Sequence, residues 1–214
     1  MDIAALRERI RVAEVQEREQ GSLGAWLHQQ LAQLHPAITP GDDPLGTLQR
    51  FVEGYIGVVP DTLEAAQAVA DSANMHAQLM PVLKVAEAFF LQPPDLPVDH
   101  QGMLALLDEA YLVHRLVEEI NDRYIVHGGE PLLPLDTTRA NLIVHQLLGD
   151  AFANQLDLVV NVAVEGLAPE SLFRSHTFDD FRHIVAQRGG VALWQSWPCL
   201  SRQLGVEILL REPG

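Results

Sequence analysis

The sequence has a single cysteine, Cys199, and a single lysine, Lys84. One cysteine excludes a disulfide within the chain and any zinc site built from several thiolates. No apolar run approaches the roughly 18 residues that a membrane-spanning helix needs. The first residues, MDIAALRERIRVAEVQERE, are charged and helical in pattern, which is not typical of a secretory signal. We therefore expect a soluble cytoplasmic protein.

Positive charge is also scarce. The formal net charge is −15, and no run of five or more basic residues occurs. A chain of this charge is repelled by nucleic acids and by anionic membranes. The composition thus favours a small molecule or another protein as the partner, with no nucleic acid and no membrane.

Recognisable catalytic motifs are absent. The sequence has no Gly-x-Ser-x-Gly element and no phosphate-binding or dinucleotide-binding loop. A di-iron site of the ferritin type needs Glu-x-x-His on two helices, but Leu112 stands three residues after Glu109 and Phe90 three after Glu87. Whether the protein is an enzyme is left open, and so is its cofactor, with a metal as one alternative.

What the sequence does contain is helical periodicity. The pattern predicts an all-α fold, an irregular bundle of about eight helices, with either a short strand or a last helical turn at Val206–Leu210. Asp43 followed by Pro44 is typical of a helix start, and Asp61 with Glu64 resembles a capping box. The expected helices span residues 2–19, 23–35, 44–57, 62–73, 74–91, 101–124, 137–164 and 177–189.

A proline-rich stretch, residues 92–100, interrupts the helices. We interpret it as an ordered crossover, because neither half of the chain looks self-sufficient. The prediction is one helical domain over residues 1–214, with 92–100 as the place where a subdivision would fall. The apolar and aromatic tail, which includes Trp194 and Trp197, is expected to dock on the body.

The best helix signal, residues 101–124, carries an ionisable group where apolar ones are expected. On a helical wheel Glu109 falls inside the broad apolar arc, and His114 lies at its edge. Asp108 and Arg115 fall on the opposite side, with Glu119 and Asp122, and are expected to face solvent. A buried carboxylate needs a partner and has a raised pKa. Glu109 thus either reaches a rim or an arginine, or belongs to a functional site.

The helix expected at 137–164 shows the same feature. Asn141 and His145 project into its inner apolar stripe, so polar groups occupy the inner faces of two consecutive helices. The predicted ligand-binding residues are Glu109, His145, His114, Asn141 and Tyr111, and the candidate metal ligands are Glu109, His145 and Glu87. A hydrogen-bonded core network of Glu109, His145 and Asn141 is the alternative.

Two hypotheses for function follow. The first is a helical protein with a polar internal pocket that binds a small molecule or a metal. The second is an acidic interaction or regulatory module without catalysis, homodimeric through the amphipathic N-terminal helix within residues 1–20.

Overall fold

The computed structural model describes residues 1–95, 99–133, 135–188 and 209–210. This part of the chain is built from eight α-helices, which confirms the all-α prediction. None of the described helices is both long enough and apolar enough to cross a membrane. The elements are α1 (Ile3–Gln20), α2 (Ser22–Leu31), β1 (Ile38–Thr39), α3 (Pro44–Ala73), α4 (His76–Leu91), α5 (Met103–Gly128), α6 (Thr138–Leu148), α7 (Asp150–Leu167), a short 3-10 helix η1 (Leu172–Arg174), α8 (His176–Arg188) and β2 (Leu209–Leu210).

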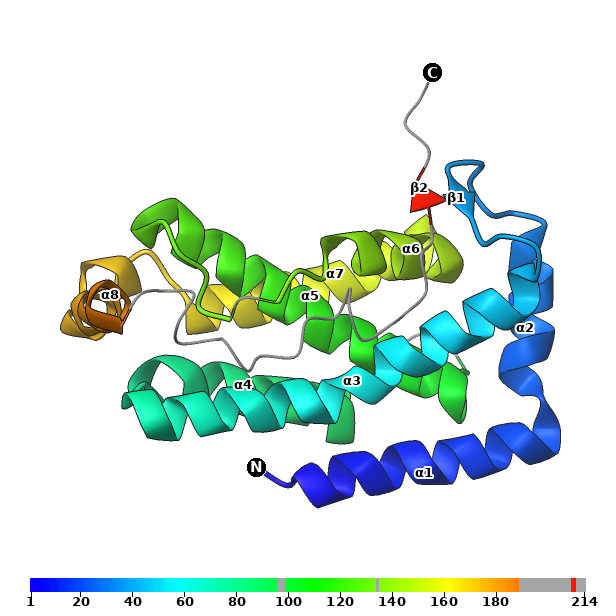
Figure 1. The fold of residues 1–214 in the computed structure, drawn as a ribbon, viewed down its shortest axis with the longest axis horizontal. Coiled ribbons are helices and arrows are strands. Elements are labelled where there is room, and N and C mark those ends of the chain that lie inside the picture. Colours follow the sequence, from blue (N-terminus) through cyan, green and yellow to red (C-terminus); the bar gives the residue numbers. More distant parts are fainter. Residues whose placement is uncertain (96–98, 134, 189–208, 211–214) are drawn as a thin grey trace.

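Helix α5 is the centre of the bundle. It runs between the layer of α3 and α4 and the layer of α6 and α7 (Figure 1), and it also contacts α1 and α2. Residues 106–114 are buried without interruption, because neighbours cover this segment on all sides. The expectation of a solvated face is therefore wrong for Asp108, which is buried. Helices α3 and α4, which precede residues 92–100, pack into the same core as α5.

Helix α3 continues through Pro60, which corrects the expectation of two helices, 44–57 and 62–73. Proline lacks the N–H that would bond the carbonyl of Ile56, and its ring crowds that carbonyl. Figure 1 shows α3 changing direction along its length. Beside this point, the buried ring of His114 donates its Nε2–H to the carbonyl of Tyr55 at 2.9 Å. Central helix α5 thus supplies a donor where the backbone of α3 is disturbed.

The helix expected at 137–164 is two helices. Gly149 separates α6 from α7, with φ of 82° and ψ of 142°. This backbone conformation ends an α-helix and is open to glycine far more readily than to other residues. The chain reverses there, so that α6 and α7 pack against each other as well as against α5.

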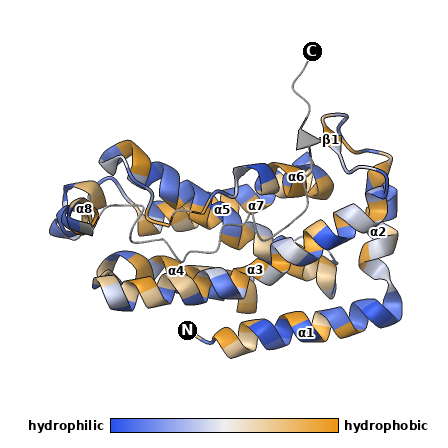
Figure 2. Ribbon diagram, viewed as in Figure 1, coloured by the Kyte–Doolittle hydropathy of each residue, from blue (hydrophilic) through white to orange (hydrophobic). Residues whose placement is uncertain are grey.

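At the periphery, β1 and β2 form an antiparallel pair in which Ile38 lies opposite Leu210. Hydrophobic and hydrophilic residues alternate along α1 (Figure 2), and its buried side chains are Leu6, Ile10 and Ala13. The predictions for Trp194 and Trp197, and for residues 206–208, concern positions outside the described residues.

Candidate functional site: a polar cleft beside the central helix

Three of the five predicted ligand-binding residues, Tyr111, Asn141 and His145, come together. They line a hollow of about 180 Å³ between α5, α6 and α7, which we call the first hollow. Its other lining residues are Arg115, Glu118, Thr138, Leu142 and Asp157. Three residues of this polar hollow were therefore among the candidates named from the sequence. Its charged residues Arg115, Glu118 and Asp157 were not.

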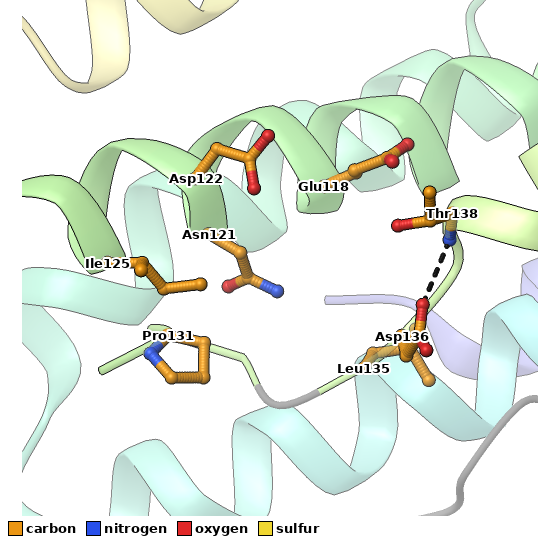
Figure 3. Close-up of a pocket in the computed structure, with 8 residues that line it drawn as sticks. All are labelled: Glu118, Asn121, Asp122, Ile125, Pro131, Leu135, Asp136 and Thr138. Atoms are coloured by element: carbon orange, nitrogen blue, oxygen red, sulfur yellow. Dashed lines mark hydrogen bonds between the residues drawn. The ribbon is translucent and has the colours of Figure 1, made fainter. Parts of the chain in front are cut away.

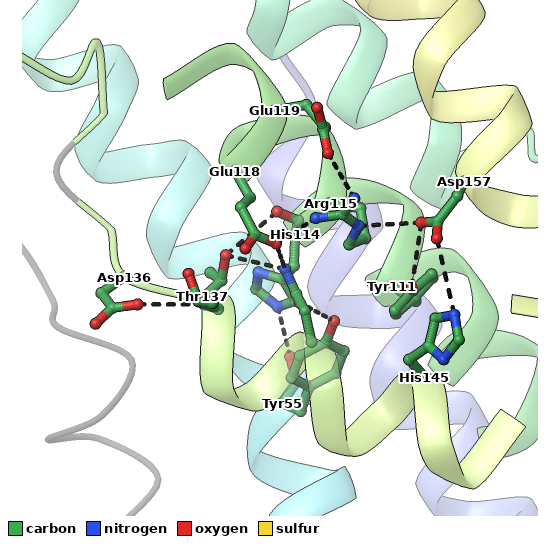
Figure 4. A network of polar contacts seen from close by, with 12 residues as sticks. Tyr55, Tyr111, His114, Arg115, Glu118, Glu119, Asp136, Thr137, His145 and Asp157 are labelled. Atoms are coloured by element: carbon green, nitrogen blue, oxygen red, sulfur yellow. Dashed lines mark hydrogen bonds and ion pairs between the residues drawn. The ribbon is translucent and has the colours of Figure 1, made fainter. Parts of the chain in front are cut away.

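Arg115 is the hub of this site (Figure 4). Its Nε donates to Asp157 Oδ1 at 3.0 Å, its Nη1 to Glu118 Oε2 at 2.5 Å and its Nη2 to Glu119 Oε1 at 2.5 Å. Burial disfavours the charge of Arg115, but the hydrogen bonds to Asp157 and Glu118 outweigh it and raise the guanidinium pKa. The guanidinium is thus engaged by three carboxylates from two helices.

A chain of buried hydrogen bonds fixes Glu118 from the other side. Tyr55 donates its hydroxyl proton to Asn141 Oδ1 at 2.6 Å, and Asn141 Nδ2 donates to Glu118 Oε2 at 2.6 Å and to Thr137 Oγ1 at 3.0 Å. Burial raises the pKa of Tyr55 well above its ordinary value, so the hydroxyl remains a donor. Glu118 Oε2 is therefore held by Arg115 and Asn141, and no hydrogen bond from the described residues reaches its Oε1.

Asp157 is held in the same manner. Tyr111 donates its hydroxyl proton to Asp157 Oδ1 at 3.1 Å, beside the bond from Arg115. The second oxygen, Oδ2, lies 3.9 Å from His145 Nε2, which is an ion-pair distance rather than a hydrogen bond. His145 also approaches Asp150, with 3.6 Å between its Nδ1 and Oδ1. The partly buried His145 side chain thus lies between these two carboxylates.

A second hollow of about 320 Å³ adjoins the first. The two share Glu118 and Thr138, and together we call them the cleft. Its wall is formed by α5 and the segment that leads into α6 (Figure 3), with lining residues Glu118, Asn121, Asp122, Ile125, Pro131, Leu135, Asp136 and Thr138. Asn121 ties that segment to α5, because its side chain accepts from the backbone N–H of Leu133 at 2.8 Å and donates to the carbonyl of the same residue.

The remaining predicted residues lie elsewhere. His114 is fully buried behind Tyr55, with ring centroids 4.3 Å apart, and burial lowers its pKa to about 4. Its hydrogen bond to a backbone carbonyl makes it a neutral structural donor. Glu109 pairs with Arg9, and Glu87 accepts the backbone N–H of Asp2.

The expected network of Glu109, His145 and Asn141 is therefore not formed. Glu109 and Tyr111 are two positions apart on α5 and so point to different sides of it, which separates Glu109 from the first hollow. Among the described residues no three His, Cys, Asp or Glu side chains are grouped so that they could hold a metal ion.

Sequence reasoning missed Arg115, Glu118 and Asp157. The i,i+3 and i,i+4 spacing of Arg115 with Glu118 and Glu119 could have indicated ion pairs on one helix face. Asp157 comes from α7, and nothing local in the sequence relates it to α5. Comparisons with protein-family models, with curated protein sequences and with solved structures each found no match for the chain.

Proposed function

We propose that this helical protein binds a small organic cation, such as a protonated amine or guanidine, in the cleft beside α5. One observation carries the proposal: Arg115 is engaged by three carboxylates, while Glu118 Oε1 and Asp157 Oδ2 accept no hydrogen bond from the described residues. Both oxygens belong to residues that line the first hollow. Fixed acceptors without donors favour a ligand that brings N–H groups with positive charge.

The charge of the whole cleft supports the same ligand class. Its lining carries four carboxylates against the single guanidinium of Arg115 and the imidazole of His145. An anionic ligand would meet repulsion there, since the guanidinium is already engaged. The apolar lining residues Ile125, Pro131, Leu135 and Leu142 would contact the carbon skeleton of the ligand.

The test is calorimetric titration of the full-length protein with matched small molecules: primary alkylamines and alkylguanidines, and the alcohols and carboxylates of the same shape. We expect the cations to bind, and the alcohols and carboxylates to bind at least about tenfold more weakly, because one charge-assisted hydrogen bond contributes about 1.5–3 kcal/mol.

The variants Glu118→Gln and Asp157→Asn should each weaken amine binding about tenfold or more. Glu165→Gln, which changes an exposed carboxylate paired with Arg123, is the matched control. Tighter binding of the carboxylates, or no binding by any cation, would refute the proposal.

A second candidate, the homodimeric interaction module, is favoured by an exposed apolar face on α7. Leu6, Ile10 and Ala13 of α1 are buried within the chain. Leu158 and Val162 of α7 are 65 % and 76 % exposed, one helical turn apart, and so are more exposed than Val12 and Val15 of α1. Ala151 and Gln155 continue this uncharged face, on which two copies of a strongly acidic chain could meet without like-charge repulsion. Size-exclusion chromatography with light scattering should then give a dimer for the wild type and a monomer for Leu158→Glu. A wild-type monomer at all concentrations would exclude this candidate.

A further inference from the structure

His145, the one histidine among the described residues that line the first hollow, lies beside the carboxylate that a bound cation would use. Its Nε2 is 3.9 Å from Asp157 Oδ2, the oxygen that accepts no hydrogen bond from the described residues (Figure 4). The other oxygen of Asp157 already accepts from Tyr111 and Arg115. The imidazole and a ligand cation would therefore face the same oxygen atom.

A second carboxylate also approaches the imidazole. Asp150, at the start of α7, places its Oδ1 3.6 Å from His145 Nδ1. The Asp150 side chain is 86 % exposed, so solvent screens this contact, whereas the Asp157 side chain is only 23 % exposed. Asp157 is therefore the stronger partner for a protonated imidazole.

Helix α5 faces the imidazole with three further polar side chains. The ring centroid of Tyr111 lies 6.3 Å from that of His145, and Arg115 and Glu118 line the same hollow. Burial raises the pKa of Tyr111 well above its ordinary value, so its hydroxyl stays uncharged, and an arginine keeps its charge throughout the neutral range. Helix α6 itself adds only uncharged lining residues, which are Thr138, Asn141 and Leu142. Histidine is the side chain whose charge ordinarily changes between pH 5 and 8.

The charge of the first hollow depends on this imidazole. When it is neutral, the carboxylates of Glu118 and Asp157 outweigh the guanidinium of Arg115 by one negative charge. Protonation of His145 cancels that charge and places a cation beside Asp157 Oδ2. The hollow measures only about 180 Å³, so a second cation in it lies close to the imidazolium and is repelled by it.

We propose that His145 regulates the cleft as a built-in competitor of the ligand: its protonated imidazole competes with the organic cation for Asp157, and its neutral imidazole does not. This inference rests on the proposed function and names the regulation of that site. The direction follows from linkage, because the cation binds best to the form that has lost the imidazole proton. Binding therefore strengthens as the pH rises through the range in which histidine titrates, and it releases a proton.

Calorimetric titration of the full-length protein with n-butylguanidine at pH 8.0 and at pH 5.5 tests the competition, because a guanidinium keeps its charge at both values. One competing proton weakens binding by at most about tenfold for each pH unit, and we expect several-fold weaker binding at pH 5.5. Titrations at an intermediate pH, in buffers that differ in ionisation enthalpy, should show that the protein releases a proton when the guanidinium binds. Circular dichroism at both pH values verifies that the protein is folded.

The variant His145→Gln keeps a polar side chain but cannot gain a proton, so its affinity should be nearly the same at the two pH values. His28→Gln makes the same change at an exposed position of α2, away from the cleft, and should keep the wild-type pH dependence. Equal wild-type affinities at the two pH values, or a pH dependence that His145→Gln retains, would overturn the competition and leave the proposed function standing. No binding at either pH would overturn both.

Discussion

Replacing Arg115 with methionine should lower the free energy of unfolding by about 3 kcal/mol at neutral pH, as expected when one partner of a buried ion pair is removed. The reason is that Arg115 serves three carboxylates at once, Glu118, Glu119 and Asp157, whose side chains are at most 30 % exposed. Methionine keeps the apolar stem but leaves these like charges close together without a cation. Urea denaturation followed by circular dichroism measures the change.

Arg7 provides the matched control, because it also bridges two carboxylates, those of Asp61 and Glu64, but on the exposed surface between α1 and α3. Solvent screens such contacts, so Arg7→Met should change the free energy of unfolding far less than Arg115→Met. Equal losses of unfolding free energy in the two variants would show that the partial burial of Arg115 does not strengthen its ion pairs. An Arg115→Met protein as stable as the wild type would contradict the stabilising role of these ion pairs.

Acidification from pH 6.5 to 4 should remove about 3 kcal/mol of stability through His114 alone. The pKa of this imidazole is about 4 in the folded protein because of its burial, against 6.5 for the free side chain. The folded state therefore binds fewer protons than the unfolded state in this range, so the stabilisation is complete above pH 6.5 and is lost as the pH falls toward 4. A protonated ring would also carry an Nδ1–H, for which the described part of the chain offers no acceptor, since Nδ1 is buried there without a hydrogen-bond partner.

The measurement is the free energy of unfolding in urea at several pH values for the wild type and for His114→Gln. Glutamine can still donate to the Tyr55 carbonyl but does not titrate, so its stability should decline less steeply with acid. His28→Gln, at an exposed position of α2, controls for the loss of a histidine. If wild type and His114→Gln decline in parallel, some other group governs the acid transition.

Capping and periodicity signals in the sequence located most of the helices. They failed at the helix boundaries that are determined by tertiary contacts. The start of α3 at Pro44 follows from its own side chains, since Asp43 accepts the N–H of Gly46 at 3.1 Å. Pro60 looked like a boundary, but packing on α5 carries the helix through it. The helix expected at 137–164 included Gly149, yet the positive φ of Gly149 turns the chain there. In both cases the local propensity was weak compared with the packing of the whole bundle.

The candidate site was also predicted only in part, because tertiary contacts decide which side chains meet. A helical-wheel analysis assumes that one face of the helix is exposed to solvent. Residues 106–114 of α5 are all buried, so the expectation that Asp108 faces solvent was wrong. Glu109 did meet an arginine, which was one of the two interpretations, but Arg9 lies 100 positions away and could not be named from the sequence. Tyr111, Asn141 and His145 could be grouped because polar residues on apolar helix faces are conspicuous. Charged residues such as Arg115 and Asp157 are ordinary on a surface, so nothing distinguished them.

Glu118 lines both hollows of the cleft, so cation binding in one hollow should affect cation binding in the other. A cation in one hollow neutralises part of the carboxylate that a cation in the other would use. Two separate ligands would therefore bind with negative cooperativity, and linkage requires that each weaken the other by the same factor, in whichever order they arrive.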